Sequence, residues 1–268
     1  MKHTKNLICI ALAIFSIGIF GAWTSVNGMP DEDRYANAQL HSLYVLETID
    51  FDTKDSNAYM NSAPHYTALS GMANACGAVA GSEIVAYYDK YYPNMIPNWE
   101  SFYASSGKYR IQDQVYIPAL MNELYVLMRT NVDDGGVSES EFVSGLTQYI
   151  NGKGYGVSMQ NVLSGTSVNY ETCKTAFENN KVIVLFSRAT NLYNIGEGTT
   201  QDNISSSALS SSHIMMAYGY KEIKYYKNGI LFRHDSYLMV STGLQGTGVA
   251  YYKVNNHSLN SAYIVNII

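Results

Sequence analysis

The stretch NACGAVAGSEIVAYYDKYYPNMIP, residues 74–97, decides how the rest of the chain is organised. Apolar residues recur in it at spacings of three and four from Ala80 to Tyr91, which predicts an amphipathic helix that begins at Cys76. Two prolines at its end stop the helix. A cysteine therefore stands at a helix start, where free backbone N–H groups and the helix dipole favour a negatively charged thiolate.

Segments with helical periodicity fill the first part of the chain, and segments typical of strands fill the second. Helices are predicted over 117–128, from a capping box of Ser138 and Glu141, and around Cys173. Residues 191–212, rich in Ser, Thr, Gly and Asn, predict a long polar loop. The predicted strands are 43–49, 154–162, 181–187, 213–220, 221–234, 236–243 and 248–254, with a hairpin turn at 228–229. We expect an α+β fold with an N-terminal helical part packed on a C-terminal antiparallel sheet.

The composition limits the classes of partner and cofactor. The chain has 268 residues, of which 47% are hydrophobic, enough to bury a sizeable core. Charged residues make up 15% and the formal net charge is -5, so the dense basic stripe that nucleic-acid binding requires is missing. The histidines show no metal-ligand spacing, and no phosphate-binding loop occurs. We expect no cofactor, no metal and no nucleic-acid partner, and the oligomeric state stays open.

The N-terminus has the pattern of a secretory signal. A basic start precedes an apolar run over 7–20, and Gly28 ends a sequence suited to cleavage. We expect removal of residues 1–28 to give a secreted or extracellular protein without stable membrane insertion. If the segment is kept, it holds the protein at the cell surface. Residues 29–60 are a lead, either a short pro-segment or part of the structure, and residues 61–268 form one domain.

Two cysteines remain after the signal, and they suggest different roles. An oxidising compartment permits a disulfide between Cys76 and Cys173, although Cys173 is also typical of a small core residue on an apolar helix face. A Cys76 thiolate is a nucleophile, and the adjacent Gly77 lets a substrate backbone approach closely. His213 lies between polar serines and an apolar strand, at a rim where it can act as a base. Taken singly, a packing cysteine and a surface histidine are the simpler interpretations.

Three segments occur in an order that resembles secreted bacterial cysteine peptidases of the papain-like superfamily, in particular the C39-like group. Residues 75–97 are similar to the nucleophile segment of those proteins. Residues 210–223 resemble the histidine segment, in which a His leads an apolar strand that ends in Gly-Tyr, and residues 235–248 resemble the strand that follows. The resemblance spans most of the mature chain, with the middle matched loosely. It implies a papain-like cysteine peptidase fold over residues 61–268.

The resemblance assigns roles to individual residues. Cys76 resembles the nucleophile and His213 the general base and acid. The Cys76 backbone N–H takes the place of the first oxyanion donor, and Asn74 is the nearest amide to stand in for the family's glutamine. Thr242 occupies the place of the residue that orients the imidazole, and Asp235, at the start of the same strand, is the alternative. A family proline after the Cys-Gly pair and a tryptophan after the third residue are both missing.

Three hypotheses follow from these patterns. The first is an exported cysteine peptidase that hydrolyses peptide or protein substrates through a thiolate and an acyl-enzyme. The second is a papain-like domain, weak or inactive because a charged third residue is missing, that binds peptides or a surface partner. The third is a structural or adhesive secreted domain with a Cys76–Cys173 bridge. A Cys-His acyl transferase such as a transglutaminase shares the chemistry of the first.

Overall fold

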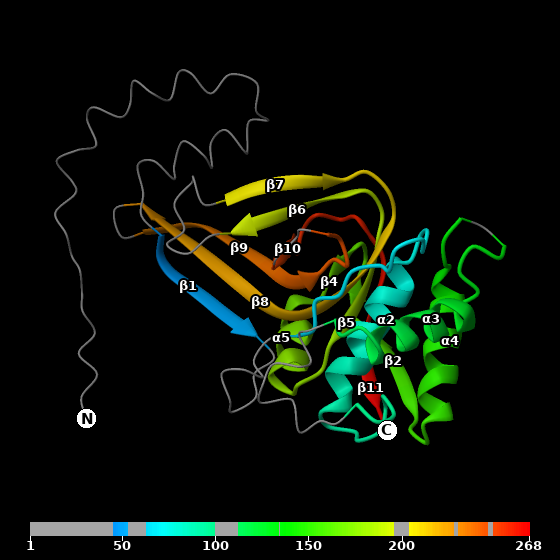
Figure 1. Ribbon diagram of the computed structural model, residues 1–268. Coiled ribbons are helices and arrows are strands. Elements are labelled where there is room, and N and C mark those ends of the chain that lie inside the picture. The colour runs from blue at the N-terminus through cyan, green and yellow to red at the C-terminus, as the bar shows by residue number, and fades with distance from the viewer. Residues whose placement is uncertain are drawn as a thin grey trace.

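The computed structural model describes residues 45–52, 63–99, 112–133, 135–195, 204–227, 230–245 and 249–268. Helices cover both faces of one half of a large antiparallel sheet (Figure 1), so the predicted α+β class is confirmed. The helices are α2 (Cys76–Asp89), α3 (Tyr116–Leu127), α4 (Glu139–Gly152) and α5 (Tyr170–Glu178). The strands are β1 (Val45–Asp52), β2 (Val157–Asn161), β3 (Leu163–Ser164), β4 (Ser167–Val168), β5 (Ile183–Ser187), β6 (Thr190–Ile195), β7 (Ile204–Leu209), β8 (His213–Lys227), β9 (Ile230–Ser241), β10 (Ala250–Lys253) and β11 (Leu259–Ile267).

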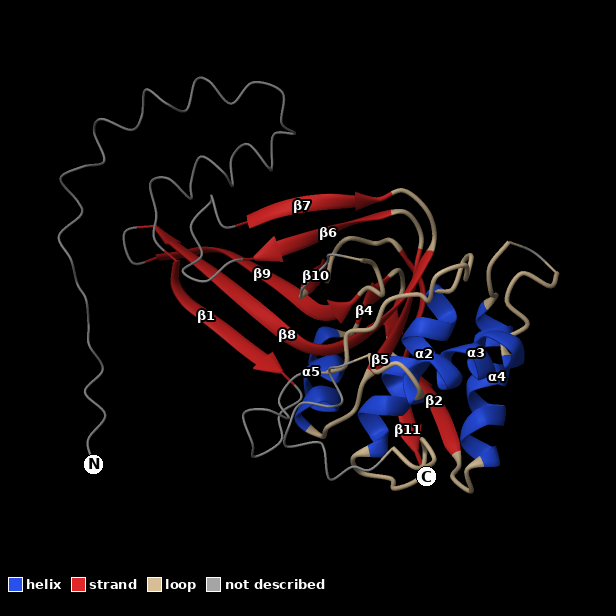
Figure 2. Cartoon of the chain, in the orientation of Figure 1, coloured by secondary structure: helices blue, strands red, loops and turns tan. Residues whose placement is uncertain are grey.

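The main sheet has nine strands in the order β2-β11-β5-β8-β9-β10-β6-β7, with β1 beside β8, while β3 and β4 form a separate pair. Strand β8 is its longest member, and two strands share one of its edges. Residues 213–217 pair with β5, and residues 219–225 pair with β1. Strands β6 and β7 extend away from the helices in Figure 2, whereas β9 and β10 contribute side chains to the buried cluster that contains α5. The first residue of β8, His213, therefore lies in the helix-covered half.

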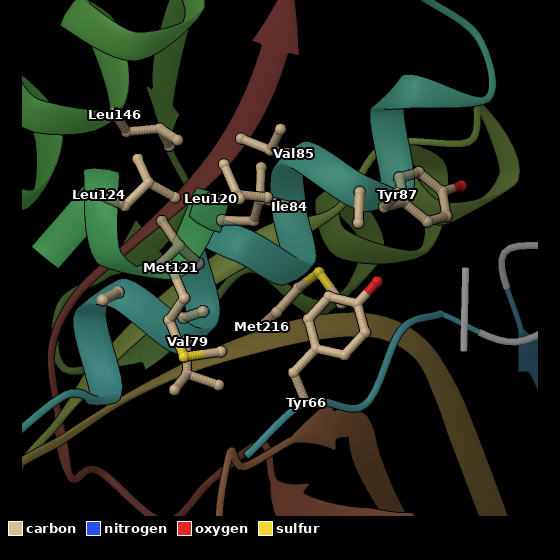
Figure 3. Packing of buried hydrophobic residues seen from close by; sticks show 14 of the residues in the cluster. Tyr66, Val79, Ile84, Val85, Tyr87, Leu120, Met121, Leu124, Leu146 and Met216 are labelled. Atoms are coloured by element: carbon tan, nitrogen blue, oxygen red, sulfur yellow. The ribbon is translucent and has the colours of Figure 1, made fainter. Parts of the chain in front are cut away.

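Both faces of the helix-covered half are buried, which explains the continuously apolar sequence of β5. Val184 and Phe186 face the cluster of α2, α3 and α4, whereas Ile183 and Leu185 face α5. Figure 3 shows Ile84 of α2 between side chains of α3 and Met216 of β8. Helix α2 is buried from Gly77 to Asp89, so the prediction of a single apolar face was too narrow. A helix enclosed on all sides is held in one place, and so is the cysteine at its start.

The start of α4 follows the predicted capping box. The Ser138 hydroxyl accepts from the Glu141 backbone N–H, and the Glu141 carboxylate accepts from the Ser138 N–H at 2.8 Å. The helix ends at Gly152, and Gly154 follows with a φ of 88°, a left-handed conformation that glycine adopts without strain. The local sequence signals thus set both ends of this helix.

Two predictions about strands were wrong. Residues 191–212 were expected to form a loop, but β6 and β7 pair there in register. In β6 the residues Thr190, Leu192 and Ile195 are buried while Asn191 and Asn194 are exposed, and the loop-like composition hid this mixture. Strand β11 was not expected, because Asn260, Ser261 and Asn266 interrupt its apolar run. Its pairing with both β2 and β5 satisfies the backbone instead.

The N-terminal predictions fall largely outside the described residues. The signal segment 1–28 and most of the lead 29–60 belong to residues that the structure does not describe. Within the lead, β1 pairs antiparallel with β8, so residues 45–52 take part in the sheet. The turn at 228–229 is also outside the described part, but Lys227 and Ile230 on either side of it are paired, as a hairpin requires. Among the described residues, no helix is long and apolar enough to cross a membrane.

A substitution at Gly145 is expected to destabilise the helical layer. A Cβ at this position would lie 2.7 Å from the Met128 backbone nitrogen and 2.8 Å from the Leu127 carbonyl carbon, so α3 and α4 would have to move apart. We expect Gly145→Ala to lower the free energy of unfolding by about 1–3 kcal/mol. Gly152→Ala, in the same helix with open space around its Cβ, is the control and should raise it by up to about 1 kcal/mol. Urea denaturation measures both, and equal effects would contradict the packing argument.

Candidate active site

Cys76 is the first residue of α2, and this helix start has no side-chain cap and no acidic residue in its first turn. The first backbone N–H groups of a helix have no carbonyl partner within it, so they remain available to other acceptors. The N–H groups of Gly77 and Ile214 hydrogen-bond to the Cys76 sulfur. The sulfur is a free thiol and the residue is half-buried. These donors favour a negative charge on it.

His213 begins β8, opposite Ser187 of β5, and a side-chain hydrogen bond links its ring to Cys76. The structure thus brings the two residues together, as predicted, although they lie in different halves of the chain. The His213 Nε2 is 2.6 Å from the Thr242 carbonyl oxygen. A carbonyl can only accept, so Nε2 carries the proton and Nδ1 is the nitrogen left for the sulfur. The Thr242 contact therefore sets the tautomer and the plane of the ring.

The two side chains shift each other's protonation in the direction of a charged pair. Burial raises the pKa of the Cys76 thiol, but the hydrogen bond and charge of His213, together with the Ile214 and Gly77 N–H groups, outweigh it and lower the pKa overall. Burial lowers the pKa of His213, but the bonds to Cys76 and to the Thr242 carbonyl outweigh it and raise the pKa overall. Both shifts favour a thiolate beside an imidazolium, which is the reactive form of a nucleophilic cysteine.

Of the two residues expected to orient His213, only Thr242 contacts its ring. Thr242 does contact the imidazole, through its backbone carbonyl and not through the hydroxyl that the sequence suggested. The expectation for Asp235 was wrong. Its buried carboxylate lies 2.6 Å from an Arg233 guanidinium nitrogen and 3.3 Å from the Lys253 ammonium nitrogen. Asp235 therefore belongs to a charge cluster on the sheet, and no carboxylate among the described residues bonds to the His213 ring.

Asn74 lines the same pocket as Cys76 and has a φ of 53°, a left-handed conformation that asparagine tolerates. Its Nδ2 donates to the Asn131 Oδ1 at 2.7 Å. Asn131 also donates to the Ala73 carbonyl at 2.9 Å and accepts from the Gly136 N–H at 2.8 Å. An amide NH₂ carries two hydrogens, so Asn74 keeps a second donor beside its bond to Asn131. Sequence reasoning missed Asn131, because only the folded loops bring it next to the residues before Cys76.

A pocket of about 490 Å³ opens in front of the cysteine. One wall comes from the start of α2 and from residues 135–139, which lead into α4. The opposite wall comes from the end of β5, from residues 211–214 and from Gly243 and Leu244 after β9. Polar and apolar side chains both line it. The Cys76 sulfur and the His213 ring therefore lie in a cleft between the helical part and the sheet, accessible to a molecule from outside.

The disulfide hypothesis is contradicted. Cys76 and Cys173 are both free thiols, and Cys173 is fully buried in the cluster below α5, on the opposite face of the sheet from α2. Burial raises the pKa of Cys173 to about 12, so its thiol is un-ionised at neutral pH. The interpretation of Cys173 as core filler is confirmed. Cys9 lies outside the described residues.

Gly243 was not predicted as part of the site, yet it determines where Thr242 lies. It has a φ of 70°, and a Cβ there would lie 2.8 Å from the Val79 side chain of α2. We expect Gly243→Ala to move the Thr242 carbonyl away from His213, because both the backbone strain and the clash act next to it. Alkylation of Cys76 at pH 6 should slow about tenfold. Gly165→Ala, also at positive φ but with open space and far from the pocket, is the control and should leave the rate unchanged.

No protein-family model matches this chain, and no curated protein matches it. The chemistry of the site therefore follows from its own geometry, in which a helix-start cysteine, a strand-start histidine and a backbone carbonyl meet in an open cleft.

Proposed function

We propose that this protein is an exported cysteine peptidase with a papain-like arrangement of a helical part against an antiparallel sheet. The observation that carries the proposal is the hydrogen bond between Cys76 and His213 inside an open pocket, with the pKa of the thiol lowered. A structural cysteine is inert and sealed in the core, as Cys173 is. A half-buried thiol with a basic partner, helix-start donors and room for a ligand is instead suited to nucleophilic catalysis.

In the proposed reaction, the Cys76 thiolate attacks a peptide carbonyl carbon, and the carbonyl π electrons move onto oxygen. The oxyanion accepts hydrogen bonds from the Cys76 backbone N–H at the helix start and from the second Nδ2–H of Asn74. The protonated His213 ring gives its Nδ1 proton to the leaving amine as the C–N bond breaks. An acyl thioester on Cys76 and a released amine are the products of this step.

The second half returns the enzyme to its starting state. Neutral His213 takes a proton from a water molecule, whose oxygen attacks the thioester carbon. Collapse of this intermediate releases a carboxylic acid and the Cys76 thiolate, and the proton remains on His213. The Thr242 carbonyl keeps the Nε2–H in place throughout, so that Nδ1 always faces the sulfur. A neutral acceptor stabilises the imidazolium less than a carboxylate does, so the proposal predicts a modest rate.

The test uses the full chain, reduced, incubated with a mixed peptide library whose products are identified by mass spectrometry. We expect new chain ends in the library with the wild type and none with Cys76→Ala. Transfer of acyl groups to an added amine without hydrolysis would replace the proposal with an acyl transferase. Intact peptides together with slow alkylation of Cys76 would replace it with a binding domain.

Export is the part of the proposal that concerns the N-terminal segment. The basic start, the apolar run over 7–20 and the small Gly28 support a signal that is cut off. Expression in a bacterium that exports the chain, followed by N-terminal sequencing of the released protein, is expected to find a chain that starts near residue 29. Recovery of uncut protein from the membrane fraction would instead support retention at the cell surface.

A further inference from the structure

The helix that carries Cys76 also carries a buried carboxyl group, that of Glu83. The role inferred for it here rests on the function proposed above. Glu83 follows Cys76 by about two helical turns, which places both on the same side of α2. Its side chain is fully buried. Burying a carboxyl group costs free energy, so a buried carboxyl group on the helix that carries the nucleophile is expected to have a function.

The Glu83 carboxyl group accepts two hydrogen bonds from residues outside its own helix. Its Oε1 accepts from the Ser241 hydroxyl at 2.5 Å and from the Tyr66 backbone N–H at 2.8 Å. Its Oε2 has no hydrogen-bond partner among the described residues. Burial raises the pKa of Glu83 to about 8, against the opposing bonds from Ser241 and Tyr66, so the group is mostly protonated at pH 7. A neutral acid in this place can hold Ser241 without bringing a charge into the core.

Ser241 is the residue before Thr242, whose carbonyl binds His213 at 2.6 Å. Ser241 and Thr242 are both buried, and Gly243 after them is in contact range of Val79 on α2. The chain of contacts therefore runs from α2 through the end of β9 to the imidazole. We propose that Glu83 is a positioning residue that fixes the end of β9 through Ser241 and thereby holds the Thr242 carbonyl against the His213 ring.

The same helix offers a matched control. Asp89 is another buried carboxyl group on α2, and its Oδ1 accepts from the Ile96 backbone N–H at 2.8 Å. It lies at the opposite end of the helix from Cys76 and does not line the pocket. Replacing Asp89 removes a buried carboxyl from α2 without touching the end of β9. A slower alkylation of Cys76 that comes only from a less stable helix will therefore appear in both the Glu83 and the Asp89 variants. A slower alkylation that comes from a displaced Thr242 carbonyl will appear only in the Glu83 variant.

The experiment measures the rate of Cys76 alkylation by iodoacetamide between pH 4 and pH 10 in the full-length protein, with unfolding temperature recorded in parallel. We expect Glu83→Ala and Ser241→Ala to slow alkylation at pH 6 about tenfold and to shift the profile toward that of an ordinary thiol. Glu83→Gln keeps the acceptor oxygen and is expected to recover most of the wild-type rate. Asp89→Ala should keep the wild-type profile even where its unfolding temperature falls.

The outcomes separate this inference from the proposed function. If the wild type alkylates like an ordinary thiol, the Cys76–His213 pair and the peptidase proposal both fail. If the wild type alkylates fast at pH 6 and Ser241→Ala keeps its profile, only the positioning role is overturned. The serine variant decides the matter where Glu83→Ala does not fold, because it removes a single hydroxyl. Equal shifts in the Glu83 and Asp89 variants would also overturn the positioning role.

Discussion

His213→Ala is expected to slow alkylation of Cys76 at pH 6 by about 100-fold and to reduce peptide hydrolysis by about 1,000-fold or more. The imidazolium supplies both a hydrogen bond and a charge to the sulfur, and together these lower the pKa of the thiol. Without the ring, burial remains and raises the pKa, so the thiolate forms only at alkaline pH. The alkylation rate plotted against pH measures this directly.

The chain contains its own control for this experiment. Cys173 is fully buried and its pKa is raised to about 12, so it should stay unlabelled in both proteins until they are unfolded. His257→Ala is a matched surface variant, since His257 bonds to Ser167 on the far hairpin at 2.9 Å and does not line the pocket. Equal alkylation profiles for the wild type and His213→Ala would rule out the thiolate–imidazolium pair.

Glu83→Gln is expected to become more stable than the wild type as the pH rises. The pKa of Glu83 is about 8 in the folded protein and 4.5 as the ordinary value, so the folded state keeps a proton that the unfolded state releases. The stability that this proton provides is fully present below pH 4.5 and is lost as the pH rises to about 8. A glutamine does not titrate, so the variant should gain on the order of 3 to 5 kcal/mol relative to the wild type across this range.

Urea denaturation at pH 5, 7 and 8.5 measures the Glu83 effect. The control is Glu141→Gln, where the hydrogen bonds from Ser138 lower the pKa of a carboxyl group at the surface. The Glu141 carboxyl group titrates at and below pH 4.5, so its replacement should change the free energy of unfolding by the same amount at all three pH values, whereas the difference for Glu83→Gln should grow. A constant difference between Glu83→Gln and the wild type at all three values would mean that Glu83 is ionised in the folded state.

Local sequence patterns were sufficient to predict the helices and most of the strands. The capping box of Ser138 and Glu141 and the glycines that follow the helix are interactions within a few residues, so the sequence predicts them directly. Strand β11 and the pair of β6 and β7 were missed for the opposite reason. Their Asn and Ser residues oppose strand formation locally, and pairing with distant strands outweighs that preference.

In the candidate site, too, some residues are marked by local sequence patterns and others are revealed only by the fold. The positions of Cys76 and His213 at element starts are visible in the sequence, because a helical periodicity begins after Cys76 and His213 separates polar serines from an apolar run. Asn131, Glu83 and Ser241 carry no such mark. Each acts through a hydrogen bond to a residue far away in the chain, as Glu83 does to Ser241. A single sequence gives no distances between such residues, so their roles became visible only with the fold.

The sequence by itself determined the α+β class and the position of α2, because short-range periodicity and end signals are properties of neighbouring residues. It pointed to Cys76 and His213 as a pair only through a resemblance between segments, since each residue taken alone fits a structural role. Only the tertiary structure decided that a backbone carbonyl orients His213, that Asp235 belongs to a charge cluster and that Cys173 is out of reach of Cys76. These facts depend on which strands pair and which face of the sheet each side chain occupies. Those choices are made by long-range packing, to which no local pattern points.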